Sequence, residues 1–160
     1  EKVKIKMTNP SNLRKITRLS IDEKQYEGYW INTGVPHLVI FVPEIGVVPV
    51  KQIGSKIRFH SFFQPEGTNV DFVKVRKGGL EIRTYERGVE DETLSCGTGA
   101  VASALVSAIV KHLASPIKVL TKGGEVTVWF RLKEEKFSDV FLEGEANAVY
   151  EGYLNGGKNV

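Results

Sequence analysis

The residues best suited to take part in a reaction lie together in the segment 90–99. Its sequence is Glu-Asp-Glu-Thr-Leu-Ser-Cys-Gly-Thr-Gly. Cys96 is the one cysteine of the chain, and Gly97 and Gly99 follow it where a helix is expected to begin. The first turn of a helix presents unpaired N–H groups and a partial positive charge, and glycines let a ligand approach them. The pattern predicts a carboxylate or phosphate site. We expect the same field to lower the pKa of Cys96.

Other interpretations of this segment compete with catalysis. A lone cysteine is more often a small buried residue than a catalyst, so the residues alone leave both roles of Cys96 open. The spacing Gly97-x-Gly99-x-x-Ala102 matches a dinucleotide fingerprint, but that motif needs a buried parallel strand before it. The preceding residues, Val89-Glu90-Asp91-Glu92, do not form such a strand, and we reject nucleotide binding. Consecutive acidic residues rarely converge on one ion. We therefore expect solvated charge at residues 90–92 and no metal site.

Four polar residues outside this segment are further candidates. Glu86 and Arg87 close a predicted strand, either as a surface ion pair or as a pair that holds the ammonium and carboxylate groups of an amino acid. Asn69 suits a zwitterionic ligand, although asparagine after Gly-Thr is also common in turns. His37 opens a predicted buried strand, where a histidine is more often structural than an acid or base.

These candidates depend on one helix and a set of strands. Residues 99–113 predict a helix that is apolar nearly all round and must therefore be buried, and Ser-Pro at 115–116 ends it. Alternating or apolar runs predict the strands 3–7, 26–31, 37–42, 70–76, 80–85, 117–120, 126–132, 139–143 and 146–150. Residues 46–54 are predicted to form a loop. The expected fold class is α+β, with mostly antiparallel β-sheets wrapped around one buried central helix.

Composition limits the class of protein. The 160 residues are 41% hydrophobic and 26% charged, which predicts one globular domain over residues 1–152 and a flexible tail at 153–160. The 22 Lys and Arg residues are interspersed with 19 acids, so we expect no nucleic-acid partner. Apolar stretches stay well short of the ~20 residues of a membrane span, and no signal peptide opens the chain. A single cysteine favours the cytoplasm. Because the chain begins at Glu1, we expect a processed or truncated piece of a longer protein.

Three segments resemble a known family. Residues 84–100, Thr-Tyr-Glu-Arg-Gly-Val-Glu-Asp-Glu-Thr-Leu-Ser-Cys-Gly-Thr-Gly-Ala, are similar to the second active-site signature of the diaminopimelate epimerases. Residues 32–39, Asn-Thr-Gly-Val-Pro-His-Leu-Val, and 67–72, Gly-Thr-Asn-Val-Asp-Phe, resemble two other family blocks in the same order. The resemblance covers nearly the whole chain but only the C-terminal half of the family. Its members are cofactor-independent racemases of two similar domains, and each domain contributes one cysteine to opposite faces of the substrate α-carbon.

The resemblance implies an isomerase that interconverts LL- and meso-diaminopimelate in lysine biosynthesis without a cofactor. In this implied site Cys96 is the second-domain acid/base, and His37 and Glu86 tune the cysteines. The implied substrate-binding residues are Asn69, Glu86, Arg87, Gly97 and Thr98. The resemblance thus favours the catalytic role of Cys96 over the buried one.

Two departures from the family limit what is carried over. Many members have an asparagine that contacts the substrate where this chain has Val35, so Val35 receives no role. The first-domain signature with its own cysteine is absent, and we expect the chain to be inactive without an N-terminal domain as partner. A homodimer is a further option. The alternatives are another two-cysteine racemase, of the proline or hydroxyproline type, and a non-catalytic ligand-binding domain of the same fold.

Overall fold

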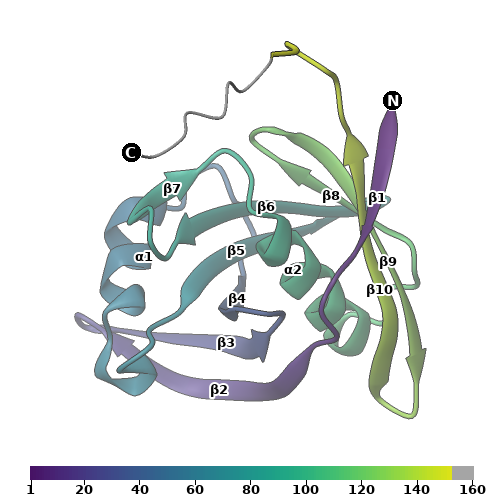
Figure 1. Ribbon diagram of the computed structural model, residues 1–160. Coiled ribbons are helices and arrows are strands. Elements are labelled where there is room, and N and C mark those ends of the chain that lie inside the picture. Colours follow the sequence, from purple (N-terminus) through teal and green to yellow (C-terminus); the bar gives the residue numbers. More distant parts are fainter. Residues whose placement is uncertain (153–160) are drawn as a thin grey trace, which may run out of the picture.

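The centre of the molecule is formed by three neighbouring strands, β4 (Pro36–Phe41), β5 (Asn69–Arg76) and β6 (Gly79–Glu86). A computed structural model describes residues 1–152 of the chain (Figure 1). The tail at 153–160, expected to be flexible, lies outside the described residues. The remaining elements are β1 (Lys2–Lys6), β2 (Ser11–Ile21), β3 (Lys24–Asn32), α1 (Val50–Arg58), a short 3-10 turn η1 (Ser61–Phe63), β7 (Asp91–Thr93), α2 (Gly97–Val110), β8 (Ile117–Thr121), β9 (Gly124–Lys133) and β10 (Lys136–Glu145).

The strands form one hydrogen-bonded sheet rather than several. Its order is β1-β10-β9-β8-β6-β5-β4-β3-β2, and the short β7 pairs with β6 beside this path. Among residues 1–152 only the β4·β5 and β6·β8 pairs are parallel, so the expected α+β fold with mostly antiparallel strands is confirmed. Figure 1 shows how the sheet bends, with β2 and β3 on one side of α2 and β9 and β10 on another.

Helix α2 is buried inside this curved sheet. Every residue from Gly99 to Ala108 is buried, and strands β3 to β6 and β8 to β10 contribute apolar side chains to the core around the helix. A helix with apolar residues on all sides has this position because each of its faces must be removed from water. The central helix is therefore confirmed, although it runs from Gly97 to Val110 and not over the predicted residues 99–113.

A second core lies on the other face of the central strands, under α1. Val50 and Ile57 of the helix pack there with residues of β2, β4, β5 and β6. Gly54 allows this close approach, because a Cβ at this position would lie 2.4 Å from Cβ of Tyr85. The predicted loop at residues 46–54 is thus wrong for its last five residues, which belong to α1.

The predicted strands are correct at the centre and wrong at two edges. Both hairpins with Gly-Gly turns, β5–β6 and β8–β9, are present. The prediction missed β2, whose eleven residues are mostly exposed and carry little apolar alternation. The predicted strand at 146–150 does not form, and the single long strand β10 pairs instead with β9 and β1.

Candidate active site

Cys96 lies at the N-terminal end of α2, in the position that caps the helix. The N–H of Ala100 donates to the carbonyl oxygen of Cys96 at 2.9 Å, which closes the first helical turn. The N–H groups of Gly97 and Thr98 precede this bond and have no acceptor within the helix. Both residues are partly exposed, so their N–H groups can bind an anionic group from outside the domain.

The strands place a set of polar side chains beneath this helix end. His37, Asn69, Asp71 and Thr84 lie on the α2 side of the sheet, because each is an even number of positions from a strand residue of the α2 core. Strand register brings them into neighbouring positions: His37 is opposite Asn69, and Asp71 is opposite Thr84. Three different strands therefore direct polar groups to the start of one helix.

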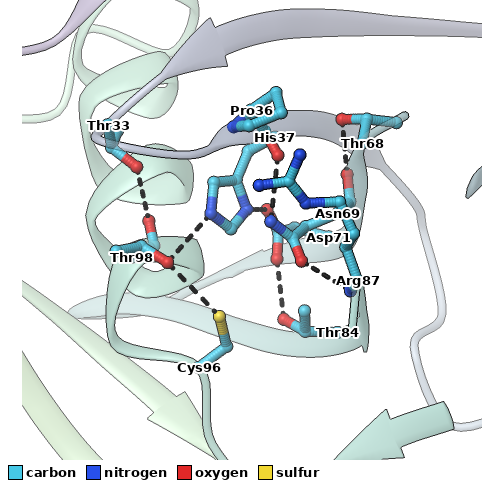
Figure 2. A network of polar contacts seen from close by, with 10 residues as sticks. All are labelled: Thr33, Pro36, His37, Thr68, Asn69, Asp71, Thr84, Arg87, Cys96 and Thr98. Atoms are coloured by element: carbon cyan, nitrogen blue, oxygen red, sulfur yellow. Dashed lines mark hydrogen bonds and ion pairs between the residues drawn. The ribbon is translucent and has the colours of Figure 1, made fainter. Parts of the chain in front are cut away.

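These side chains form a continuous chain of contacts that ends at the thiol (Figure 2). Thr84 Oγ1 donates to Asp71 Oδ1 at 2.7 Å, and Asp71 Oδ2 lies 2.7 Å from His37 Nδ1. His37 Nε2 lies 3.0 Å from Thr98 Oγ1, which in turn is 3.5 Å from Cys96 Sγ. The histidine and the aspartate are both completely buried. Buried polar groups with this degree of pairing hold one another in a single geometry.

Gly99 is needed for the carboxylate to approach the helix so closely. A Cβ at this position would lie 2.5 Å from Asp71 Oδ1, which is shorter than any ordinary contact. The glycine pattern in the sequence predicts only access for a ligand. In the structure Gly99 accommodates a side chain of the protein itself, whereas Gly97 remains at the partly exposed end.

The predicted lowering of the Cys96 pKa is wrong for this domain. Burial raises the pKa of the Cys96 thiol to about 11, and the negative charges of Asp71 and Glu86 act in the same direction. The Thr98 hydroxyl and the N–H of Gly99 oppose this shift without cancelling it. Cys96 is only 5% exposed as a residue, so loss of water outweighs the field of the helix.

The other candidate residues lie at the ends of the same strands. Asn69 is buried; its Nδ2 donates to the carbonyl oxygen of Pro36 at 3.0 Å, and its Oδ1 accepts from the N–H of Arg87 at 2.7 Å. Arg87 Nη1 donates to the carbonyl oxygen of Glu66 at 3.0 Å. Among residues 1–152 Arg87 forms no ion pair with Glu86, so the surface-pair interpretation does not hold. Asn69 thus positions the turn that carries Arg87.

The prediction of solvated charge at residues 90–92 holds only in part, because the Asp91 side chain is partly exposed but all three acids pair with basic side chains. Glu90 pairs with Arg58 at 3.0 Å, and Asp91 and Glu92 pair with Lys51 and Arg83. Two of these residues belong to β7, which pairs with β6. The run therefore fastens the segment before Cys96 to α1 and β6. Within the described part of the chain, no group of three or more His, Cys, Asp or Glu side chains is arranged to hold a metal ion.

Sequence reasoning missed three members of this cluster. Asp71 and Thr84 lie in segments that resemble the family but carry no predicted role; Asp71 contacts His37, and Thr84 donates to Asp71. Thr33 also contributes, because its Oγ1 donates to the carbonyl oxygen of Thr98 at 3.2 Å. One signal was available: a charged residue in the apolar run Asn-Val-Asp-Phe-Val is expected to be buried with a partner.

A family model and the curated relatives both match this chain to the diaminopimelate epimerases. A family model described as diaminopimelate epimerase matches residues 29–149. A diaminopimelate epimerase from Aquifex aeolicus is 48% identical over 158 residues, which are 96% of this chain and 55% of that protein. One from Hydrogenobaculum sp. is 41% identical and covers 97% of this chain and 56% of its own length. The chain thus spans about half the length of the curated relatives it matches.

A solved structure supports the fold alone. A probable proline racemase from Agrobacterium radiobacter superimposes with a TM-score of 0.63 at 19% identity, covering 94% of this chain and 54% of that protein. No helix in the described residues is both long and apolar enough to cross a membrane.

Proposed function

The chain belongs to the diaminopimelate epimerase family, and we propose that it supplies one of the two proton-transfer groups of a cofactor-independent epimerase. Residues 1–152 would form the C-terminal domain of that enzyme, and Cys96 would act on one face of the substrate α-carbon. The proposed substrates are LL- and meso-diaminopimelate, and the proposed role is in lysine biosynthesis in the cytoplasm.

The main observation in support of this proposal is that a helix N-terminus and a chain of buried polar side chains meet at Cys96. One helix end offers two free N–H groups beside the thiol, and a buried histidine and aspartate reach the same thiol through Thr98. A buried histidine–aspartate pair is not required for a small buried cysteine to pack. A buried cysteine with a raised pKa that contacts other titratable groups at a partly exposed helix end is typical of a catalytic site.

The proposed reaction step is a proton transfer. The Cys96 thiolate removes the α-proton; the C–H bond breaks, an S–H bond forms, and the electron pair remains on the α-carbon and its carboxylate. The N–H groups of Gly97 and Thr98 bind that carboxylate and stabilise the added negative charge. A cysteine thiol from the other domain then protonates the carbanion on the opposite face, which inverts the centre. In the reverse direction Cys96 begins as the thiol.

Glu86 and Arg87 would hold the polar groups of the substrate. Both side chains are partly exposed at the end of β6, and Arg87 has further N–H donors beyond the one bound to Glu66. Asn69 would act indirectly, since its amide holds the N–H of Arg87 and the carbonyl of Pro36. Val35 offers no polar side chain, and its place in substrate binding remains unassigned.

The proposed enzyme needs a second half. The relatives are about twice as long as this chain, and Cys96 is its one cysteine. We therefore propose an N-terminal domain with its own cysteine as the essential partner, and we expect this chain alone to be inactive. A homodimer of the complete enzyme is compatible with this arrangement.

The test is exchange of the substrate α-proton in deuterated water by the complete two-domain protein. meso-Diaminopimelate and proline are supplied in parallel, and deuterium incorporation is followed by NMR or mass spectrometry. We expect incorporation into diaminopimelate and none into proline. Incorporation into proline alone would favour a proline-type racemase, and binding without exchange of either would favour a non-catalytic ligand-binding domain.

A further inference from the structure

The Asp71 carboxylate is fully buried, and its partners are a hydroxyl and a histidine ring in place of a permanently charged lysine or arginine. Its contacts are the hydroxyl of Thr84 and the ring of His37; no lysine or arginine in the described residues forms an ion pair with it. A buried carboxylate without a permanent cation is costly, and two neutral donors compensate only part of that cost. This arrangement calls for a role beyond packing.

The contacts fix the direction of every hydrogen bond when Asp71 is ionised. A carboxylate only accepts, so His37 Nδ1 must carry a proton and donate to Asp71 Oδ2. In the neutral ring Nε2 is then the acceptor, and it receives the hydroxyl proton of Thr98 at 3.0 Å. The Thr98 oxygen is thereby free to accept from the Cys96 thiol, 3.5 Å away.

We propose that Asp71 is a positioning residue that sets up a proton relay from Cys96 through Thr98 to His37, an inference that rests on the proposed role of Cys96. In the relay the thiol proton moves to Thr98 Oγ1 while the Thr98 proton moves to His37 Nε2. The S–H bond breaks, an N–H bond forms, and the result is a thiolate with an imidazolium. The heavy atoms need not move, and the negative charge of Asp71 stabilises the imidazolium.

The relay explains how a thiol in this environment can act as a base. Burial and the charges of Asp71 and Glu86 oppose formation of a Cys96 thiolate that stands alone. The titratable side chain of β4 that reaches this group, through Thr98, is His37. Transfer to His37 keeps the displaced proton inside the cluster, so the site gains no net charge when the thiolate forms. Asp71 thus has two opposite effects on Cys96, one direct and unfavourable, the other favourable through His37.

The two effects predict opposite changes in the reactivity of Cys96 when Asp71 is replaced. Alkylation of this chain reports on Cys96 directly, because Cys96 is its one cysteine. The measurement is the rate of alkylation by iodoacetamide near pH 7. If Asp71 acts only as a nearby negative charge, Asp71→Asn speeds alkylation. If the relay operates, Asp71→Asn slows alkylation by roughly tenfold or more, and so does Thr98→Val, whereas Thr98→Ser retains the rate. Asp22→Asn, which neutralises an exposed carboxylate, is the matched control. Faster alkylation of folded Asp71→Asn overturns the proposal.

A second measurement needs no variant and covers the case in which Asp71→Asn does not fold. Nitrogen-15 NMR of histidine-labelled chain reports which ring nitrogen of His37 carries the proton. We expect the Nδ1–H form at neutral pH; a dominant Nε2–H form overturns the relay. Both measurements are independent of diaminopimelate. A normal relay with no epimerase activity in the two-domain protein would therefore refute the proposed function and not this inference.

Discussion

Cys96 is subject to two opposing influences that the sequence alone could not weigh. Its position at the start of α2 favours the thiolate, and this was legible from the glycines and the apolar run that follow it. Its burial and the charge of Asp71 favour the thiol, and both depend on strands far away in the sequence. The second influence is the larger one because the thiol is almost completely removed from water.

The raised pKa predicts a loss of stability at alkaline pH. A group whose pKa is about 11 in the folded chain, against roughly 8.5–9 when unfolded, stabilises the fold only while it keeps its proton. This contribution is complete below the unfolded pKa and is lost as the pH rises towards 11, by on the order of 2 kcal/mol. Denaturant unfolding of the chain and of Cys96→Ala from pH 8 to 11 isolates it, since other titrating groups cancel in the difference. Identical pH dependence of the two would contradict the raised pKa.

Cys96→Ser in the two-domain protein should nearly abolish epimerisation without unfolding the domain. A serine hydroxyl is a much weaker base than a thiolate, and one positioned acid/base group contributes roughly 10²–10⁴-fold. We expect kcat to fall by about 10²-fold or more. Ser95→Ala, which removes a neighbouring exposed hydroxyl, is the control and should retain activity. Unchanged turnover in Cys96→Ser would rule out Cys96 as an acid/base.

The elements divide into those that local pattern specifies and those that need distant partners. Helix α2 and the two Gly-Gly hairpins were predictable, because a long apolar run and a tight turn each carry a local signal. Helix α1 has only nine residues, one of them Gly54, and its stability comes from packing on Tyr85 of a strand about 30 residues away. The edge strand β2 likewise depends on its pairing with β3.

The site shows the same division. Cys96, Gly97 and Thr98 share one helix start and could be identified together from the sequence. The linkage of Asp71 to His37 follows from the parallel pairing of β4 with β5, which no local pattern reveals. Asn69 was predicted to bind substrate, and that role stays a prediction, because its side chain is engaged with protein groups.

The turn after β6 is fixed by an ion pair with α1, and this predicts an effect on substrate binding. Arg58 donates to Glu90, whose Oε1 also accepts from the N–H of Gly88, and the N–H of Glu90 donates to the carbonyl of Glu86. Glu90→Ala in the two-domain protein removes this acceptor, so it should release the turn and raise KM for diaminopimelate by roughly tenfold, with a smaller effect on kcat.

The same helix offers a matched control for that variant. Lys56 forms an exposed ion pair with Asp22, and exposed pairs contribute little to stability. Lys56→Gln should therefore leave KM unchanged. An equal change of KM in both variants would show that α1 acts through general stability and not through the turn.

The described fold supplies the groups for one of the two faces of the proposed substrate. Its sheet and both cores are complete within residues 1–152, so the described fold does not need a second domain to bury its central helix. The relatives are nevertheless about twice as long, and Thr98 and Gly97 remain partly exposed at the surface. A substrate bound there would meet protein on one face and water on the other.

An epimerase assay of this chain alone, and of the chain mixed with a separately produced N-terminal domain, tests the central claim most directly. Inversion by two bases needs an acceptor and a donor on opposite faces, and this chain has one cysteine. We predict no epimerisation of diaminopimelate by the chain alone and recovery on mixing, with a concentration dependence set by the affinity of the two domains. Full activity of the chain alone would contradict the account, because a single cysteine would then serve both faces.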